Sequence, residues 1–400
     1  MRAVEIKPDV YWVGVNDRFT HLFEGFWPIG EEGISYNAYL LKDEKNVLID
    51  LAKSIKTDEF FEQIEEIIPV SKINYVVINH MEPDHTGILT VLKKIAPDVE
   101  ILISEKGANL LKAFYHIDNK VRIVKDQQEI NIGKKTLRFY YTPYVHWPET
   151  MMTYEINHKI LFSCDGFGGY GVLRGTIFDD ECSEKDFYLK EMLRYYTNIV
   201  ATFSRPVLKA IEKLKSVPIE VIAPSHGLIW RKQPDLVVNL YKKWAEYASQ
   251  PSEKGVTLLY GSMYGNTERF MSSVLKGLSQ TGIPVEVFNV AETHVSYILA
   301  SLWKYRGVII GAPTYEGSLF PPMAETLEVS SIKHVQFKTA AIFGSYGWSG
   351  GASKRAKEIA EALKWQIVDV YDFNGGPTEE DLKRAEKLGF DFAQKILNQP

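Results

Sequence analysis

The chain has 400 residues, and its 46 Lys and Arg against 51 Asp and Glu give a net charge of −5. This length predicts two or three domains at about 150 residues each, and the mildly acidic balance argues against a nucleic-acid partner. With two cysteines, Cys164 and Cys182, the sequence cannot form a four-cysteine zinc, iron–sulfur or rubredoxin-type iron site. The low cysteine use, the charged N-terminus and the lack of an apolar run of about 20 residues favour a cytoplasmic protein without a membrane span.

The first part of the chain mixes strands and helices, with strands dominating early. Expected strands cover 10–15, 35–41, 46–50, 75–79, 99–104, 137–141, 151–155, 159–163 and 219–223. A helix is expected over 57–67 with Thr57 as its N-cap, and an amphipathic helix over 236–248. The polar segment 250–255, which contains Pro251 and Gly255, then predicts a domain boundary.

Strands and helices alternate strictly in the last part of the chain. Expected strands cover 256–260, 284–289, 307–311, 338–344 and 366–371, and a helix over 379–397 closes the chain. Such alternation predicts right-handed crossovers and a parallel sheet covered by helices on both faces.

Histidines and carboxylates of the first part gather where expected strands end. The six residues from His80 to His85 include four ionisable ones, and further ones follow other strands. Because strand ends form one rim of an α/β fold, these side chains should converge, and burying so many charges without a metal would be costly. The candidate metal ligands are His80, Glu82, Asp84, His85, His146, Asp165 and His226. His21, in a loop before the strand 35–41, is a possible pocket residue.

Three loops follow the first, third and fourth strands of the second part. The first combines hydroxyls with a helix N-terminus, which is typical of an anion cradle, and lacks the Gly-Lys pair of a Walker A loop. The other two are rich in glycine and aromatic residues, as needed to flank a planar ring. The candidate cofactor-binding residues are Ser262, Met263, Tyr264, Gly265, Asn266, Thr267, Pro313, Thr314, Tyr315, Glu316, Gly317, Ser345, Tyr346, Gly347, Trp348, Ser349 and Gly350. These loops resemble those of flavodoxin, which implies FMN as the ligand.

The run from His80 to His85, with the more distant His146, Asp165 and His226, resembles the signature of the metallo-β-lactamase superfamily. That signature is His-x-His-x-Asp-His followed by a distant His, Asp and His. Glu82 departs from it, because it stands where the zinc hydrolases carry their second histidine. Four imidazoles and three carboxylates make a harder, more anionic site that suits iron, which can change oxidation state.

Together the two parts resemble the flavodiiron protein family (A-type flavoproteins). The resemblance implies a metallo-β-lactamase-like αββα sandwich with a diiron site over 1–250. A flavodoxin-like FMN-binding domain, built on a doubly wound five-stranded parallel sheet, then covers 255–400. Within this family His80, Glu82 and His146 correspond to the ligands of one iron, and Asp84, His85 and His226 to those of the other, with Asp165 bridging. In some members the residue at the position of His85 turns away from the metal.

The resemblance also implies an activity and partners. The family reduces dioxygen to water, nitric oxide to nitrous oxide, or both, and FMN relays electrons to the iron pair. An external donor such as rubredoxin or a rubredoxin-like reductase is implied, because this sequence lacks the cysteines for a rubredoxin domain. Members form head-to-tail dimers in which the flavin of one subunit abuts the irons of the other, so we expect a homodimer or homotetramer.

Two alternatives of other classes remain at this point. One is a zinc-dependent metallo-β-lactamase-like hydrolase with an accessory flavodoxin domain, against which Glu82 argues. The other is a non-catalytic electron carrier whose first half only scaffolds, against which the full set of ligand residues argues.

Overall fold

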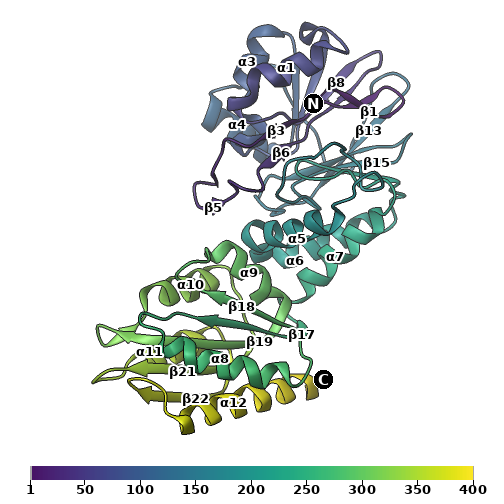
Figure 1. Cartoon of the computed structure of the whole chain (residues 1–400). Helices are drawn as coiled ribbons and strands as arrows, with labels where there is room; N and C mark the ends of the chain where they lie inside the picture. The colour runs from purple at the N-terminus through teal and green to yellow at the C-terminus, as the bar shows by residue number, and fades with distance from the viewer. Residues whose placement is uncertain (1, 400) are drawn as a thin grey trace. The chain divides into compact units, whose positions relative to one another are not determined.

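The computed structural model describes residues 2–399 and divides into two compact units, Met1–Ala245 and Glu246–Pro400. The predicted boundary segment, 250–255, lies just after this division. Each unit contains its own sheets and helices (Figure 1). No helix within residues 2–399 is both long enough and apolar enough to cross a membrane.

The first unit contains two facing sheets. The larger has seven strands in the order β1-β2-β7-β8-β9-β10-β11, and the smaller has five in the order β12-β13-β14-β15-β16. The strands of the larger sheet are β1 (Val4–Lys7), β2 (Val10–Trp12), β7 (Tyr39–Leu41), β8 (Asn46–Ile49), β9 (Ile73–Ile78), β10 (Glu100–Ile103) and β11 (Val121–Ile123). Those of the smaller are β12 (Glu129–Asn131), β13 (Thr136–Tyr141), β14 (Met151–Glu155), β15 (Ile160–Cys164) and β16 (Val221–Pro224). Two further two-stranded sheets pair β3 (Val15–Asp17) with β6 (Ile34–Tyr36) and β4 (Leu22–Phe23) with β5 (Trp27–Pro28).

Helices cover both outer faces of this pair of sheets (Figure 1). On one side lie α1 (Thr57–Glu65), α3 (Leu89–Ile95) and α4 (Glu105–Tyr115), and on the other α5 (Lys185–Tyr195), α6 (Ser204–Leu214) and α7 (Pro234–Glu246). The short helix α2 (Pro83–Thr86) follows β9 at the edge of the sheet. The predicted αββα sandwich is thus confirmed.

The structure differs from the predicted elements in three details. The expected strands 10–15 and 35–41 are each broken in two. The second break, between β6 and β7, lies at Asn37, whose side chain bonds to the backbone oxygens of Pro224 and Gly227, both at 2.9 Å. Thr57 is not the N-cap of α1, since its hydroxyl donates back to the Ser54 oxygen at 2.7 Å and the cap position is Lys56.

The second unit has the predicted doubly wound parallel sheet. Five parallel strands run in the order β18-β17-β19-β21-β22, so the chain reverses direction across the sheet between β17 and β19. They are β17 (Glu253–Tyr260), β18 (Val285–Asn289), β19 (Tyr305–Tyr315), β21 (Thr339–Tyr346) and β22 (Gln366–Asn374), and the short β20 (Ser318–Leu319) adds antiparallel to β19. The helices are α8 (Asn266–Ser279), α9 (Val295–Lys304), α10 (Pro321–Ile332), α11 (Ala352–Ala362) and α12 (Glu379–Asn398).

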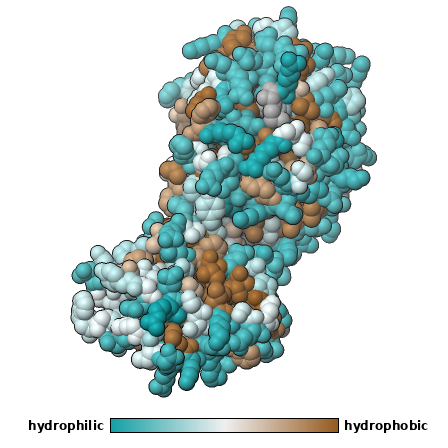
Figure 2. Space-filling model, viewed as in Figure 1, coloured by the Kyte–Doolittle hydropathy of each residue, from teal (hydrophilic) through white to brown (hydrophobic). Residues whose placement is uncertain are grey.

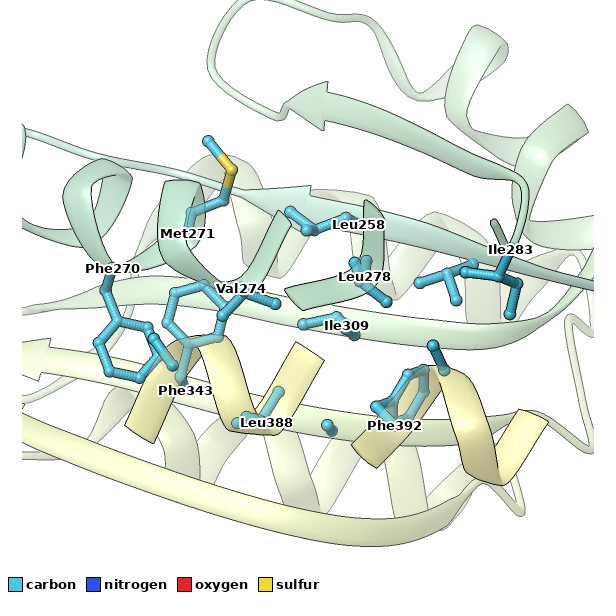
Figure 3. Close-up of a cluster of buried hydrophobic side chains, with 14 of the residues drawn as sticks. Leu258, Phe270, Met271, Val274, Leu278, Ile283, Ile309, Phe343, Leu388 and Phe392 are labelled. Carbon is cyan, nitrogen blue, oxygen red and sulfur yellow. The ribbon is translucent and has the colours of Figure 1, made fainter. Parts of the chain in front are cut away.

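The core of the second unit lies between the sheet and the helix pair α8 and α12 (Figure 3). Phe270 of α8 stacks on Phe373 with ring centroids 4.9 Å apart, and Leu388 and Phe392 of α12 face the same cluster. The two helices approach closely because each has a glycine at the crossing. A Cβ added to Gly277 would overlap the Glu386 oxygen, and one added to Gly389 would overlap the Val274 oxygen. Hydrophilic side chains cover much of the visible face of both units (Figure 2).

Candidate metal centre and flavin pocket

Seven metal-binding candidates converge at the strand ends of the first unit. His80 follows β9, Asp165 follows β15 and His226 comes shortly after β16, while His146 lies between β13 and β14. The α2 segment supplies Asp84 and His85, and Glu82 precedes it. None of the seven exposes more than 8% of its surface. The structure therefore brings all seven predicted residues together in the interior.

The side chains form two groups around a shared carboxylate. In the first, the Nε2 atoms of His80 and His146 lie 3.2 and 3.0 Å from Oε2 of Glu82. Both Nε2 atoms also lie 3.4 Å from Oδ2 of Asp165. The other oxygen of Asp165, Oδ1, faces the second group. One carboxylate thus faces both groups, as a bridging ligand would.

The second group contains Asp84, His85 and His226. Nε2 of His85 lies 3.0 Å from Oδ1 of Asp165 and 3.3 Å from Oδ1 of Asp84. Nε2 of His226 lies 3.3 Å from Oδ1 of Asp165 and 3.3 Å from Oδ2 of Asp84. His85 therefore points into the cluster rather than away from it.

The charges of the cluster strongly shift its titration. Burial lowers the pKa of His80, but its hydrogen bonds to Glu149 and Glu82 raise it to about 10. At His226, His85 and His146 the neighbouring carboxylates also outweigh burial. They raise the pKa of His226 to about 10 and the pKa values of His85 and His146 to about 9. Despite burial, the facing imidazoles hold the pKa of Glu82 and of Asp165 below their usual range. Without a metal, protons bound to the imidazoles supply the positive charge that balances the carboxylates.

The arrangement fits two metal ions better than protons alone. Among residues 2–399, both oxygens of Asp84 and of Asp165, and Nε2 of His85 and of His226, are buried without a well-formed hydrogen bond. Ligand atoms about 2.0–2.2 Å from one ion lie roughly 3.0–3.5 Å apart, which matches the spacing within each group. Metal binding would satisfy these atoms and displace the protons. Mixed imidazole and carboxylate donors suit iron.

Several side chains around the cluster were not predicted from the sequence. Glu149 bonds to Nδ1 of His80 at 2.7 Å, and nothing in the sequence around it marked this role. Tyr195 has its ring 5.6 Å from that of His226, with a buried hydroxyl that makes no hydrogen bond within residues 2–399.

His21 is exposed and belongs to neither group of possible ligands in the described part of the chain. Its role as a pocket residue stays a prediction.

The predicted cofactor loops surround one pocket of about 560 Å³ in the second unit. It lies at the carboxyl ends of β17, β19 and β21, beside the switch point where such sheets bind ligands. The lining includes every predicted residue except Gly265 and Gly350, and adds Gly375, which follows β22. The Gly-Gly pair after the fifth strand was the signal for this extra loop.

The pocket combines an anion site with exposed aromatic rings. The helix α8 begins at Asn266, so its free backbone amides face the pocket where a phosphate can bind. Thr267 is buried and its hydroxyl bonds to that of Ser345 at 2.9 Å. At the rim, Trp348 is 95% and Tyr264 89% exposed, which leaves both rings available to a planar ligand. These features fit a flavin mononucleotide.

Comparisons with known proteins agree with both halves. Residues 34–227 match the ODP family beta lactamase, and residues 258–389 match flavodoxin. A nitric oxide reductase of Moorella thermoacetica is 32% identical, covering 99% of this chain and 100% of the relative. The rubredoxin oxygen:oxidoreductase of Desulfovibrio gigas superposes with a TM-score of 0.93 at 30% identity, covering 99% of both chains. A flavodiiron protein of Giardia intestinalis superposes with a TM-score of 0.91 at 30% identity, covering 99% of this chain and 97% of that one.

The chain belongs to the flavodiiron protein family. Like its flavodiiron relatives it is an oxidoreductase, and the family implies FMN and a diiron centre as its cofactors. The two groups of buried ligands and the open pocket are the places in this chain that fit these cofactors. A zinc hydrolase with an accessory flavodoxin domain is thereby disfavoured.

Proposed function

We propose that this flavodiiron protein reduces dioxygen to water, nitric oxide to nitrous oxide, or both. The observation that carries the proposal is the buried cluster of four imidazoles and three carboxylates, in which Asp165 turns one oxygen to each group of ligands. A relative is named for nitric oxide and another for dioxygen, so the site is proposed for either diatomic gas.

The residues of the cluster have distinct roles in this proposal. His80, Glu82 and His146 hold one iron, Asp84, His85 and His226 hold the other, and Asp165 bridges them. When bound, a diferrous pair supplies two electrons and reduced FMN two more, which together make the four that dioxygen reduction to water requires. The three carboxylates balance the positive charge of the ions, and burial of the whole set keeps bulk water out.

Electrons must reach the flavin from outside the chain. We infer a rubredoxin-type donor, because the sequence has two cysteines and a rubredoxin-type iron site needs four. One relative, from Desulfovibrio gigas, is named for its use of rubredoxin. The same low cysteine use favours the cytoplasm as the place of the reaction.

We further propose that the working unit is a head-to-tail homodimer, alone or doubled into a tetramer. The flavin pocket and the metal cluster belong to different compact units joined by a short polar segment. In a two-fold dimer, the flavin of one subunit can serve the irons of the other, and the symmetry repeats the pairing.

The activity is tested by reducing the iron- and FMN-loaded protein without air and then adding each gas separately. Rapid reoxidation of the flavin, with water or nitrous oxide as the product, is expected for at least one gas. A protein with two irons and FMN that reacts with neither would contradict the proposal.

The dimer is tested by complementation between two inactive variants. His146→Ala removes a proposed iron ligand, and a double variant Ser262→Ala with Thr267→Ala weakens the flavin pocket. Mixed and reassembled, the two should regain part of the activity, because one hybrid pairing restores an intact flavin–iron couple. No recovery in proven hybrid dimers, or a fully active monomer, would contradict it.

A further inference from the structure

Glu149 lies beside the metal cluster without belonging to it. It is 3% exposed, and its Oε1 accepts hydrogen bonds from Nδ1 of His80 at 2.7 Å and from the Met81 amide at 3.0 Å. Its backbone oxygen accepts from the Ser104 hydroxyl at 2.7 Å, so the residue is fixed at its main chain as well. Its second oxygen, Oε2, is buried without a hydrogen bond in the described part of the chain. A buried carboxylate so incompletely satisfied calls for a compensating positive charge nearby.

Three of the four imidazoles, those of His80, His226 and His85, differ in the group that their Nδ1 atom faces on the side away from the metal position. Nδ1 of His80 donates to the charged carboxylate of Glu149. Nδ1 of His226 donates to a neutral acceptor, the Ser35 carbonyl, at 2.7 Å. Nδ1 of His85 is buried and makes no hydrogen bond among residues 2–399. The acceptor of Nδ1 is therefore a charged carboxylate at His80 and a neutral carbonyl at His226, and Nδ1 of His85 has no acceptor among the described residues.

Such support affects how well an imidazole binds a metal. A hydrogen bond from Nδ1 fixes the tautomer with Nε2 free, and orients the ring toward the ion. A carboxylate acceptor also raises the basicity of the ligand nitrogen more than a carbonyl does. Because Glu149 bonds to the Met81 amide too, it also holds the turn between His80 and Glu82, both of which face the first group.

We propose that Glu149 is a positioning residue that makes the two metal positions unequal. Through His80 it tightens the position formed with Glu82 and His146, and leaves the position of Asp84, His85 and His226 the weaker one. The inference rests on the ligand assignment of the proposed function. One iron should accordingly bind first and be lost last.

The chain offers a matched control six residues further on, at the end of β14. Glu155 of β14 is fully buried, and it accepts from Nδ1 of His158 at 3.0 Å and from the Asn157 amide at 2.9 Å. His158 lies outside both groups of possible ligands. Glu149→Gln and Glu155→Gln therefore remove the same charge from similar buried sites, yet only the first faces a proposed ligand.

The test titrates metal-free protein with ferrous ions in the absence of air, in competition with a chelator of known affinity. The wild type should bind two ions in two separate steps. E149Q should weaken the tighter step by about 10–100-fold, the usual effect of losing such an outer partner, and leave the weaker step within about twofold. E155Q should leave both steps unchanged. The melting temperature of the metal-free variants shows whether a change in affinity follows from lost folding.

Each other outcome decides against a named part of the account. Unchanged affinities in E149Q, or an equal loss at both steps with a lower melting temperature, would overturn the role of Glu149. A wild type that binds two ions equally tightly would overturn the inequality. A wild type that does not bind two ferrous ions would instead contradict the proposed ligand set. If E149Q does not fold, Glu149→Asp is titrated in its place, and weakening confined to the tighter step is again expected.

Discussion

The two sites of this protein are built in opposite ways. In the first unit, buried charged side chains from residues 80 to 226 meet in the interior, and no continuous segment supplies them all. In the second, three loops form an open pocket with an exposed Trp348 at its rim. A buried charged cluster depends on its ions for charge balance, whereas an open pocket with backbone donors is largely formed before its ligand arrives. Loss of the ligand should thus disturb the first unit more.

The two units also differ in the direction in which the pKa values of their buried basic groups are shifted. In the first unit, facing carboxylates outweigh burial and raise the pKa of the cluster's imidazoles to about 9 or 10. In the second unit, no carboxylate within the described residues pairs with Lys338, and burial with the charge of Arg306 lowers its pKa to about 7. Its ammonium group bonds to the Ser252 hydroxyl at 2.9 Å and the Trp303 carbonyl at 3.2 Å. In the absence of metal, folding of the first unit therefore favours protonated imidazoles, whereas folding of the second favours a neutral Lys338.

The largest effect is expected from Asp165→Asn, which removes the charge shared by both groups of ligands. Metal binding should weaken by more than the roughly 10–100-fold that loss of an outer hydrogen-bond partner costs, and gas reduction should be lost. Elemental analysis after gel filtration measures the metal retained. FMN content should not change, because the pocket lies in the other unit.

Asp179→Asn is the control for that change. Asp179 is fully buried in the same unit, but it accepts from the amides of Arg231, Lys232 and Gln233 instead of facing the cluster. This variant should lose stability and keep its metal. Full metal content in Asp165→Asn would show that the two groups do not share that carboxylate.

Raising the pH should move the two units in opposite directions once metal and flavin are removed. The cluster's imidazoles titrate near their ordinary value of 6.5 when unfolded and at about 9 or 10 when folded, so their stabilisation is complete below about pH 6.5 and lost as the pH rises toward 10. Lys338 titrates at 10.5 unfolded and about 7 folded, so the second unit gains stability between pH 7 and 10.5. Calorimetry at pH 7, 8 and 9 should show one transition falling and the other rising.

Two changes test whether the imidazoles and Lys338 cause these opposite pH dependences. Restoring iron should abolish the fall, since the metal replaces the protons. Lys338→Met should abolish the rise. Two transitions that shift together would contradict the assignment of opposite proton uptake to the two units.

Gly389→Ala tests packing in the second unit alone. The added methyl would force α12 away from the Val274 oxygen of α8, and overpacking of this kind costs about 1–3 kcal/mol. Chemical unfolding followed by flavin fluorescence measures the loss, and metal content should stay constant. Lys383→Ala, on the exposed side of α12, is the control and should change the free energy of unfolding by less than about 0.5 kcal/mol.

The smallest effect is expected from Thr267→Ala in the flavin pocket. Its buried hydroxyl bonds to Ser345, and losing it should weaken FMN binding by about 1–3 kcal/mol without affecting the fold. Fluorescence titration of the flavin-free protein measures the dissociation constant. Ser272→Ala removes an exposed hydroxyl of the same helix and should bind FMN normally. Equal affinity in both variants would place the phosphate elsewhere.

The sequence predicted the second unit more closely than the first. Strict alternation of strands and helices located all five parallel strands, because each buried strand is a short apolar run bounded by turns. In the first unit, the break between β6 and β7 depends on Asn37 bonding to Pro224 and Gly227, far along the chain, which periodicity cannot reveal. Similarly, Thr57 has the residue type of an N-cap but bonds to the turn before it.

The candidate sites show the same limit. The metal-binding candidates could be found because each follows a predicted strand, and strand ends meet at one rim. Glu149 could not, because its role comes from an Nδ1 atom of His80 that lies 69 positions away in the sequence. Gly375 was missed because the loop after the fifth strand was not included among the cofactor loops, although the Gly375-Gly376 pair marked a turn there.

The most direct test of the diiron flavoprotein account is the metal content of protein produced with both iron and zinc available. Elemental analysis should find about two irons per chain, because three carboxylates with Glu82 in the set make a hard site that suits iron, together with FMN. Two zincs per chain in place of iron would contradict the redox role of the cluster.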